Sequence, residues 1–388
     1  MLGSNTNKLA WIGVSLGIVL ALGTTTIVVF PNAMPDLKQA IVNLGGTTKE
    51  HVDKKVSLSD QQQTLYREYK ERYFVTKGDQ TYVNSAPDGA SYVVSEGQGY
   101  GMILASVAGD KSDFESLYQY YLANRYNSTE LMSWRQDKNP DKVYDNNATD
   151  GDLYIVQSLY KAYDRWGDKA YLAQANKLAS AILTYNYNSQ DKFLTLGNWA
   201  GSDTSVYHDL RASDIIPTFY ENIYQHNRDE RWHELAENGY VILKKASDAT
   251  TTGLIPDNLK YQNGNVTILD KSPLDNTTDN NYSYDALRVP LNMALSDDDS
   301  AKAVNQKMLA FFDKQSPIKA GYNPKTGAVT GDYVDVAFLA PIYAATVQNS
   351  GYANVESQVN YLATKTTLVN SYYPDSQILM SAYLKKLN

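Results

Sequence analysis

Three carboxylates stand just ahead of apolar stretches with helical period, in three separated parts of the chain. They are Glu96 in SEGQGYGM, Asp150 in ATDGD and Asp285 in YSYDALR. A fold that gathers the N-termini of helices on one face would bring these side chains into one cleft. Two of them could then act as acid and base while the third holds a substrate. That is the chemistry by which glycosidic bonds are hydrolysed.

Each of these residues also has a simpler structural explanation. Glu96 could merely complement a helix macrodipole. Asp150 or Asp152 could cap one helix, and Asp285 could cap another. Arg288 lies one helical turn after Asp285. It could orient that carboxylate and keep it ionised, or it could form a surface ion pair.

Composition excludes several other kinds of protein. Of the 388 residues, 43% are hydrophobic, which is enough to bury a full core. The net charge is −8 and no basic cluster interleaves with aromatic residues, so nucleic acid is a poor partner. Cysteine is absent, which excludes disulfides and thiolate metal sites, and with only four histidines a zinc enzyme is disfavoured. We expect neither a metal nor a cofactor.

Tyrosine is unusually frequent, with 32 residues beside five tryptophans. Flat rings with a polar edge suit the faces and hydroxyl edges of sugars, and they also fill helix interfaces. For any single tyrosine, packing is the stronger explanation. Composition therefore only weakly favours a protein that binds carbohydrate.

The amino terminus predicts a membrane anchor. Residues 9–30 read LAWIGVSLGIVLALGTTTIVVF and carry no charge, which matches the length of a spanning helix. No good cleavage site follows Phe30, so residues 1–30 are predicted to remain as a single-pass anchor. Placing the short, weakly basic end in the cytoplasm leaves the rest outside the cell. Residues 31–57 read as a polar linker and residues 58–388 as the folded domain.

Helical periodicity alternates with loops throughout the domain, which predicts an all-α fold. Short turns such as Gly167-Asp168, Asn227-Arg228 and Ser350-Gly351 make consecutive helices into hairpins, and stacked hairpins form a toroid. The longer loops fall between hairpins and should share one end of the toroid with helix starts. A short strand or two is expected in the loop 248–284, around Val266–Leu269. The predicted helices are 58–74, 97–109, 112–125, 150–166, 168–186, 209–227, 229–247, 285–295, 299–314, 332–348, 352–364 and 375–387.

The residues around Asp150 resemble a known family signature. The run from Ala148 to Ile155 is similar to the signature of glycoside hydrolase family 8, with Val156 where that family usually has Ala. The SEGQGYGM segment resembles the one that holds the family's general acid, and YDALRVP resembles the one that holds its general base. All three occur in family order, and the resemblance covers residues 58–388.

This resemblance implies an (α/α)6 barrel that hydrolyses β-1,4-linked polysaccharides with inversion at the anomeric carbon. On that analogy Glu96 is the proton donor and Asp285 the base that activates water. Asp150 grips the sugar, and Asp152 is a weaker binding candidate. Burial and the charges of Asp150 and Asp152 would have to raise the pKa of Glu96 against the helix dipole. The glycines of SEGQGYGM would let backbone and sugar approach closely.

Aromatic residues near these segments are candidate sugar platforms. Trp134 resembles a stacking platform of the family, and Trp199 and Tyr284 are further candidates, although burial at the barrel rim is an equal alternative. Asp214 is a departure, because cellulase-like members tend to have an aromatic residue there and chitosanase-like members an Asp. An extra carboxylate would suit a cationic sugar. His208 reads as a structural histidine rather than a site residue.

The sequence thus predicts a membrane-anchored extracellular endo-glycosidase acting on a cellulose-like β-glucan, trimming exopolysaccharide at its own cell surface. The alternatives are a chitosanase of the same family, a polysaccharide lyase, and a non-catalytic binding accessory of an exopolysaccharide synthase. Binding alone does not need an acid and base pair, and a lyase would not need this carboxylate set. We expect a monomer whose partners are the polysaccharide, the membrane and the exopolysaccharide synthesis machinery.

Overall fold

The computed structural model describes residues 58–138, 141–270 and 280–387, which belong to the unit His51–Asn388. The predicted anchor (1–30) and linker (31–57) lie outside the described residues, so both stay predictions. Among the helices of the described ranges, none combines the length and apolarity needed to cross a bilayer.

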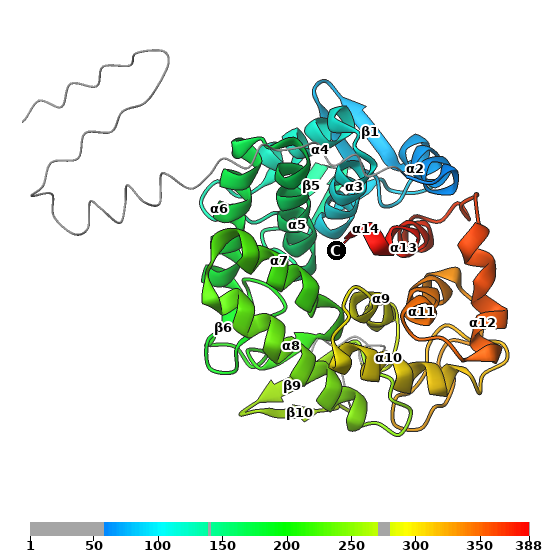
Figure 1. Cartoon of the computed structure of the whole chain (residues 1–388). Helices are drawn as coiled ribbons and strands as arrows, with labels where there is room; N and C mark the ends of the chain where they lie inside the picture. The colour runs from blue at the N-terminus through cyan, green and yellow to red at the C-terminus, as the bar shows by residue number, and fades with distance from the viewer. Residues whose placement is uncertain (1–57, 139–140, 271–279, 388) are drawn as a thin grey trace, which may run out of the picture. The chain divides into compact units, whose positions relative to one another are not determined.

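Twelve helices of the described part form two concentric rings (Figure 1). Each inner helix packs on an outer one, and the last inner helix, α13, contacts both α2 and α3, so the ring closes. This is the predicted (α/α)6 barrel. The inner helices are α3 (Ser95–Ala108), α5 (Thr149–Trp166), α7 (Pro217–Asn227), α9 (Val289–Ala294), α11 (Val336–Gln348) and α13 (Tyr372–Ala382). The outer helices are α2 (Asp60–Tyr73), α4 (Lys111–Asn124), α6 (Lys169–Tyr185), α8 (Glu230–Asp248), α10 (Asp299–Phe312) and α12 (Ala353–Val359).

Three of the hairpins share one turn chemistry. α3 and α5 end at Gly109 and Gly167, whose φ angles of 79° and 69° are left-handed and suit glycine. α7 ends in the same conformation at Arg228. In each case the next residue is an aspartate whose side chain accepts a hydrogen bond from the first turn of the following helix. These caps are Asp110, Asp168 and Asp229.

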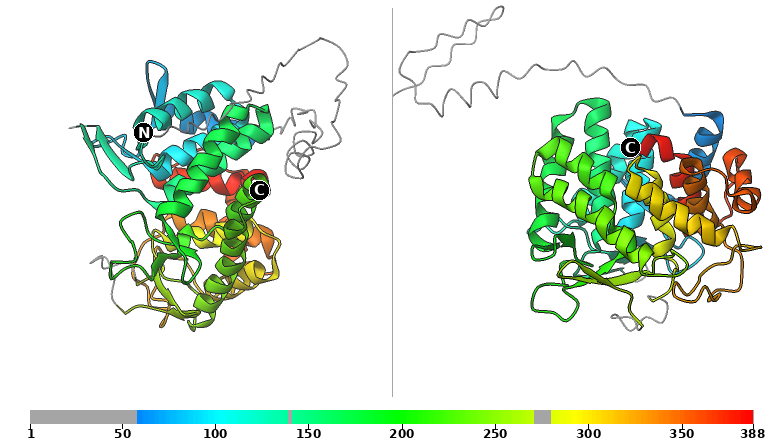
Figure 2. Two further views of the ribbon diagram at one scale, coloured as in Figure 1. Left: turned by 90° about the vertical axis from the view of Figure 1, so that its left-hand side faces the viewer. Right: turned by 60° about the horizontal axis from the view of Figure 1, so that its bottom comes forward.

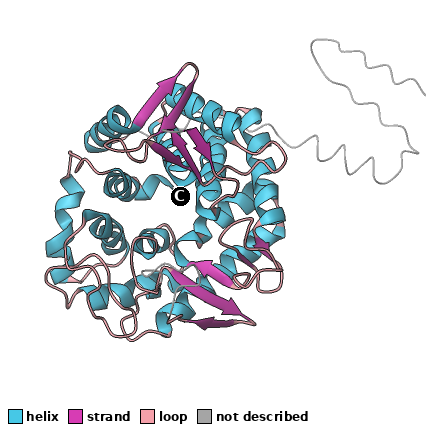
Figure 3. Ribbon diagram, turned by 180° about the vertical axis from the view of Figure 1, so that it is seen from behind, coloured by secondary structure: helices cyan, strands magenta, loops and turns pink. Residues whose placement is uncertain are grey.

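Short antiparallel strands and long connections collect at one end of the barrel (Figures 2 and 3). At this end β3 runs directly into α3, and β8 leads through the 3₁₀ turn η1 (Ala212–Asp214) toward α7. The strands therefore fix where inner helices begin. They are β1 (Phe74–Lys77) with β2 (Gln80–Val83), β3 (Tyr92–Val94) with β4 (Arg135–Lys138) and β5 (Asp141–Val143), β6 (Tyr187–Asn188) with β7 (Phe193–Leu194), and β8 (Asp209–Arg211) with β9 (Asn258–Gln262) and β10 (Asn265–Thr267).

The prediction of an all-α domain was incomplete, because only β10 had been expected. The predicted helix 209–227 was wrong in its first half, which forms β8 and η1, and Pro217 in the first turn sets the start of α7. The predicted helix 285–295 begins as a 3₁₀ turn, η2 (Ala286–Arg288). Asp335 caps α11, which therefore begins at Val336 rather than 332. The last predicted helix begins earlier, at Tyr372, and ends in a separate turn, α14 (Leu384–Leu387); α12 likewise continues as η3 (Asn360–Thr364).

Buried tyrosines pack among the helices of both rings. Tyr69, Tyr73, Tyr100, Tyr154 and Tyr160 are each at most 2% exposed. Each such ring removes roughly 150–250 Å² from water. The packing interpretation is confirmed for these residues, and the sugar interpretation is left to the exposed aromatic residues near the strand end.

Candidate active site

Glu96 lies in the first turn of α3, directly after β3. The backbone N–H of Ser95 donates to the carbonyl of Trp134 (3.0 Å), which fixes this helix start against the strand sheet. One turn on, the Tyr100 hydroxyl donates to Glu96 Oε1 (2.5 Å). The Glu96 side chain is 17% exposed, so it is largely enclosed and still reaches the surface of the site.

Arg288 gathers the three predicted carboxylates around one guanidinium. Its Nη1 donates to Glu96 Oε1 (2.5 Å) and to Asp150 Oδ2 (2.8 Å), while its Nη2 lies 3.5 Å from Asp285 Oδ1. Nη2 also donates to Ser213 Oγ (2.7 Å). Residues almost two hundred positions apart therefore converge, as the sequence predicts.

The structure corrects the predicted role of Arg288 in two ways. Its shortest contacts are with Glu96 and Asp150, and Asp285 is its most distant partner. Its side chain is only 1% exposed, so it is neither a surface ion pair nor open to a sugar. It organises the carboxylates from beneath the site, and a direct binding contact is not available to it.

The site raises the pKa of Glu96 to about 7. Burial is the largest cause, and the charges of Asp150 and Asp285 add to it, while Arg288 and the Tyr100 hydroxyl oppose it. For Asp150, burial also opposes ionisation, but the guanidinium groups of Arg288 and Arg211 outweigh it and hold the pKa below its usual value. Neighbouring carboxyls with such different pKa values can serve as acid and as charged binding group.

Asp285 precedes η2 and makes no side-chain cap bond there, so helix capping does not explain it. Its side chain is 35% exposed and faces Arg211, whose Nε lies 2.9 Å from Oδ2. Asp257 holds the surrounding backbone, because its Oδ1 accepts from the N–H groups of Ser283 (3.1 Å) and Ala286 (2.7 Å). An open, charged carboxylate on a fixed backbone is suited to taking a proton from water.

Asp152 does not fit the binding prediction. Its side chain is fully buried, and its two oxygens accept from the Met132 N–H (3.0 Å) and from the Asn147 side-chain amide (2.8 Å). Burial raises the pKa of Asp152 to about 7. It fixes the loops ahead of α5 and leaves no surface for a sugar. It is also not among the largest influences on the pKa of Glu96, which are burial, Arg288, Asp150, Tyr100 and Asp285.

The glycines of SEGQGYGM serve helix packing rather than the approach of a sugar. A Cβ on Gly97 would lie 2.3 Å from the Tyr372 hydroxyl, and one on Gly99 would lie 2.5 Å from Cβ of Tyr154 on α5. The reciprocal contact is Gly151, where a Cβ would lie 2.0 Å from Ser95 Oγ. These close approaches bring the starts of α3 and α5 together and so place Glu96 beside Asp150.

The remaining predicted residues surround the carboxylates with different exposure. Trp199 and Tyr284 are 37% and 39% exposed, and Trp134 is half-buried with its ring 5.2 Å from that of Tyr144. Trp199 and Tyr284 therefore keep ring surface available for stacking against a sugar. Asp214 is 2% exposed, burial raises its pKa well above the usual range, and its Oδ2 has no hydrogen-bond partner among the described residues.

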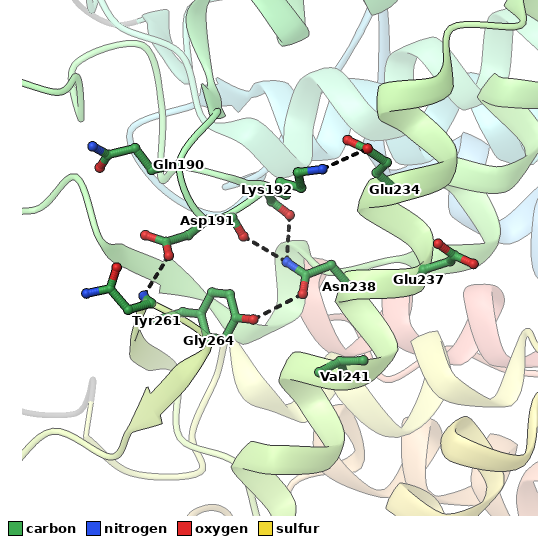
Figure 4. Close-up of a pocket in the computed structure, with 10 residues that line it drawn as sticks. Gln190, Asp191, Lys192, Glu234, Glu237, Asn238, Val241, Tyr261 and Gly264 are labelled. Carbon is green, nitrogen blue, oxygen red and sulfur yellow. Dashed lines mark hydrogen bonds and ion pairs between the residues drawn. The ribbon is translucent and has the colours of Figure 1, made fainter.

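His208 belongs to a structural cluster, as predicted. Its Nδ1 pairs with Asp191 (2.9 Å), whose other oxygen accepts from the Asn263 N–H. Asp191 also borders a surface hollow of about 530 Å³ between α8 and the β9–β10 hairpin (Figure 4). There the Asn238 amide donates to the carbonyls of Asp191 and Lys192. These groups are paired with one another, and none of the predicted site residues lines the hollow.

Comparison with known proteins identifies the family. The profile of glycosyl hydrolases family 8 matches residues 51–386. The chain belongs to this family. This family 8 hydrolase is 30% identical to a β-glucanase of Niallia circulans over 77% of the chain and 80% of the relative, and 28% identical to an endoglucanase of Bacillus sp. strain KSM-330 over 88% and 78%. Its fold matches the structure of a β-1,3-1,4-glucanase from Paenibacillus sp. X4 with a TM-score of 0.77 and 26% identity, covering 85% of this chain and 92% of that one.

Several residues of this family 8 hydrolase that shape the site were missed from sequence. Tyr100 stands four positions after Glu96, so helical spacing could have identified it. Ser213 and Asp257 gave no such signal, because each acts across a long sequence separation through one hydroxyl or one carboxylate. Tyr373 donates to the carbonyl of Tyr284 (2.7 Å) from the last inner helix, which only the closed barrel brings near.

Proposed function

We propose that the protein is an inverting endo-hydrolase of a β-1,4-linked glucan, with Glu96 as general acid and Asp285 as general base. The observation that carries this proposal is the shared guanidinium of Arg288. It joins a carboxyl whose pKa is raised to about 7 with an exposed carboxylate and with the ionised Asp150. An acid that is protonated near neutral pH beside a charged base is the arrangement that this reaction needs.

In this mechanism Asp150 binds the sugar next to the scissile bond. Glu96 gives its proton to the glycosidic oxygen as the bond to the anomeric carbon breaks. Asp285 accepts a proton from the water molecule that attacks the same carbon from the opposite face, and this water supplies the new hydroxyl group. Solvent then returns a proton to Glu96 and removes one from Asp285. The alkaline limb of kcat/KM should lie near pH 7, where free Glu96 loses its proton.

A neutral glucan fits the charges of the site better than chitosan does. The chitosan alternative depends on Asp214 supplying negative charge to a cationic sugar. Burial raises the pKa of the Asp214 carboxyl well above its usual range, although the guanidinium groups of Arg211 and Arg288 oppose this shift. The raised pKa works against the negative charge that the chitosan alternative needs from Asp214. The relatives named as a β-glucanase and an endoglucanase support the same substrate class.

A substrate panel with product analysis tests this function. We expect the purified protein to release reducing ends from carboxymethyl cellulose or mixed-linkage glucan faster than from chitosan or xylan. NMR of the first products should show the α-anomer, because an inverting enzyme, whose carboxyls generally lie about 6.5–9.5 Å apart, lets water attack from the face opposite the leaving group. A β-anomer product would contradict the assignment of Asp285 as base. Preference for chitosan would establish the alternative substrate.

We also propose that residues 1–30 anchor the enzyme in the cell membrane with the catalytic domain outside. The support is the uncharged stretch 9–30 followed by a polar linker. There the enzyme would trim polymer made at its own surface, beside the machinery that synthesises it. Deleting residues 1–30 should leave activity on soluble glucan unchanged but alter the matrix of the cell. An unchanged matrix would contradict this role.

A further inference from the structure

The charged side chain closest to the proposed base belongs to Arg211, at the end of β8. Its Nε lies 2.9 Å from Asp285 Oδ2, whereas Arg288 lies 3.5 Å from Oδ1. The Nε–H is not aligned for a hydrogen bond, so the attraction is an ion pair between two partly exposed side chains. With Arg211 20% exposed, solvent screens this pair only in part.

Hydrogen bonds connect the backbone segment that carries Arg211 to the segment that carries the proposed base, Asp285. Arg211 pairs with Asn258 in the β8–β9 ladder, and the next N–H, that of Ala212, donates to the carbonyl of Asp257 (3.0 Å). The carboxylate of Asp257 in turn holds the backbone on both sides of Asp285. The guanidinium and the base therefore keep a fixed relation to one another before any substrate binds.

The donors of Arg211 are also unused. Its Nε–H is buried and finds no acceptor within residues 58–138, 141–270 and 280–387, and its guanidinium makes no hydrogen bond to them. A guanidinium carries five N–H donors. Of these donors, the Nε–H group lies beside Oδ2 of Asp285, so Arg211 acts on the base through its charge.

We propose that Arg211 is the positioning residue of the base: its ion pair with Asp285 holds that carboxylate in the orientation from which it takes a proton from water. This inference rests on the proposed function. It explains why a half-buried cation occupies the strand end, a position for which a neutral side chain would suffice if the strand served only the fold.

The test compares Arg211→Gln with Arg231→Gln in the full-length protein, with β-glucan as substrate. Arg231 is an exposed arginine on α8 that pairs with Asp229, so its loss makes the same change of net charge away from the site. We expect Arg211→Gln to lower kcat about 10- to 100-fold, with KM changed less than about threefold. Arg211→Lys, which keeps the positive charge, should recover part of kcat.

Each other outcome is decisive. If Arg211→Gln matches Arg231→Gln in kcat, the positioning role is overturned. A raised KM with unchanged kcat would assign Arg211 to sugar binding and also overturn it. If Arg211→Gln does not fold, Arg211→Lys decides, because wild-type kcat in that variant overturns the proposal and a reduced kcat with unchanged KM supports it. A wild-type protein inactive on glucan, xylan and chitosan overturns the proposed function together with this inference.

Discussion

Replacing Glu96 with Gln should make the protein more stable at alkaline pH while it abolishes most activity. Gln has nearly the same shape, and its carbonyl can still accept from Tyr100 and Arg288, but it carries no titrating proton. The folded protein raises the pKa of Glu96 from an ordinary 4.5 to about 7, mainly through burial. At about 1.4 kcal/mol for each pKa unit, this shift corresponds to roughly 3 kcal/mol.

The sign follows from proton linkage. The folded state holds the proton of Glu96 more tightly than the unfolded chain does. The stability that this proton confers is therefore complete below about pH 4, and it is lost as the pH rises until the folded carboxyl ionises near pH 7. Wild type should lose this contribution between pH 4 and pH 8, and Glu96→Gln should not. The variant should thus gain about 3 kcal/mol relative to wild type across that range.

Urea unfolding of both proteins at pH 4, 6 and 8 measures this difference. Exposed Glu71 on α2 provides a control, because Glu71→Gln makes the same chemical change in water, where no such pH-dependent gain is expected. In parallel, kcat of Glu96→Gln should fall about 10²- to 10⁴-fold, the usual contribution of a general acid. The reasoning is refuted if the stability difference between Glu96→Gln and wild type does not grow with pH, or if the variant turns over normally.

Three other substitutions test the packing and hydrogen bonds that hold the site, and one exposed aromatic residue near it. Gly151→Ala places a Cβ 2.8 Å from the Glu96 backbone nitrogen, so denaturant unfolding should show a loss of at least about 1–3 kcal/mol, and wild-type stability would contradict the packing argument. Asp152→Ala leaves two buried donors without an acceptor and should cost about 2–5 kcal/mol in the same assay, whereas a neutral effect would restore a binding role. Trp199→Ala, at a ring 37% exposed, should raise KM for long glucans several-fold with little change in kcat, and an unchanged KM would exclude it as a platform.

Much of the barrel could be predicted because its signals are local. Apolar period marks each helix, and a left-handed residue followed by a capping aspartate marks the turn within a hairpin, as at Gly167. The convergence of Glu96, Asp150 and Asp285 followed from placing helix starts on one face. The strands at that same face were missed, since two- and three-residue strands such as β6 and β8 are too short for alternation to show.

The functions of single residues within the site depended on contacts that no local pattern contains. Asp150 and Asp152 lie in the same turn of α5, yet one faces Arg288 and the other faces the loop N–H of Met132. Sequence spacing could not separate them, because the difference arises from which neighbour each side chain meets across the barrel. The burial of Arg288 was hidden for the same reason: an arginine one turn after an aspartate resembles an exposed ion pair until the other helices are in place.

Burial and the balance of charge together explain why the pKa of Glu96 is raised while that of Asp150 is lowered. Two guanidinium groups, those of Arg211 and Arg288, face four carboxyls, of which Asp285 is the most exposed at 35%. Two cations can compensate two anions, and the pKa of Asp214 is raised like that of Glu96. A further ionisation would place an uncompensated negative charge in the interior, which is costly. Burial, with too few cations nearby to offset it, therefore raises the pKa of the acid, although the position of Glu96 at a helix start would alone favour the carboxylate.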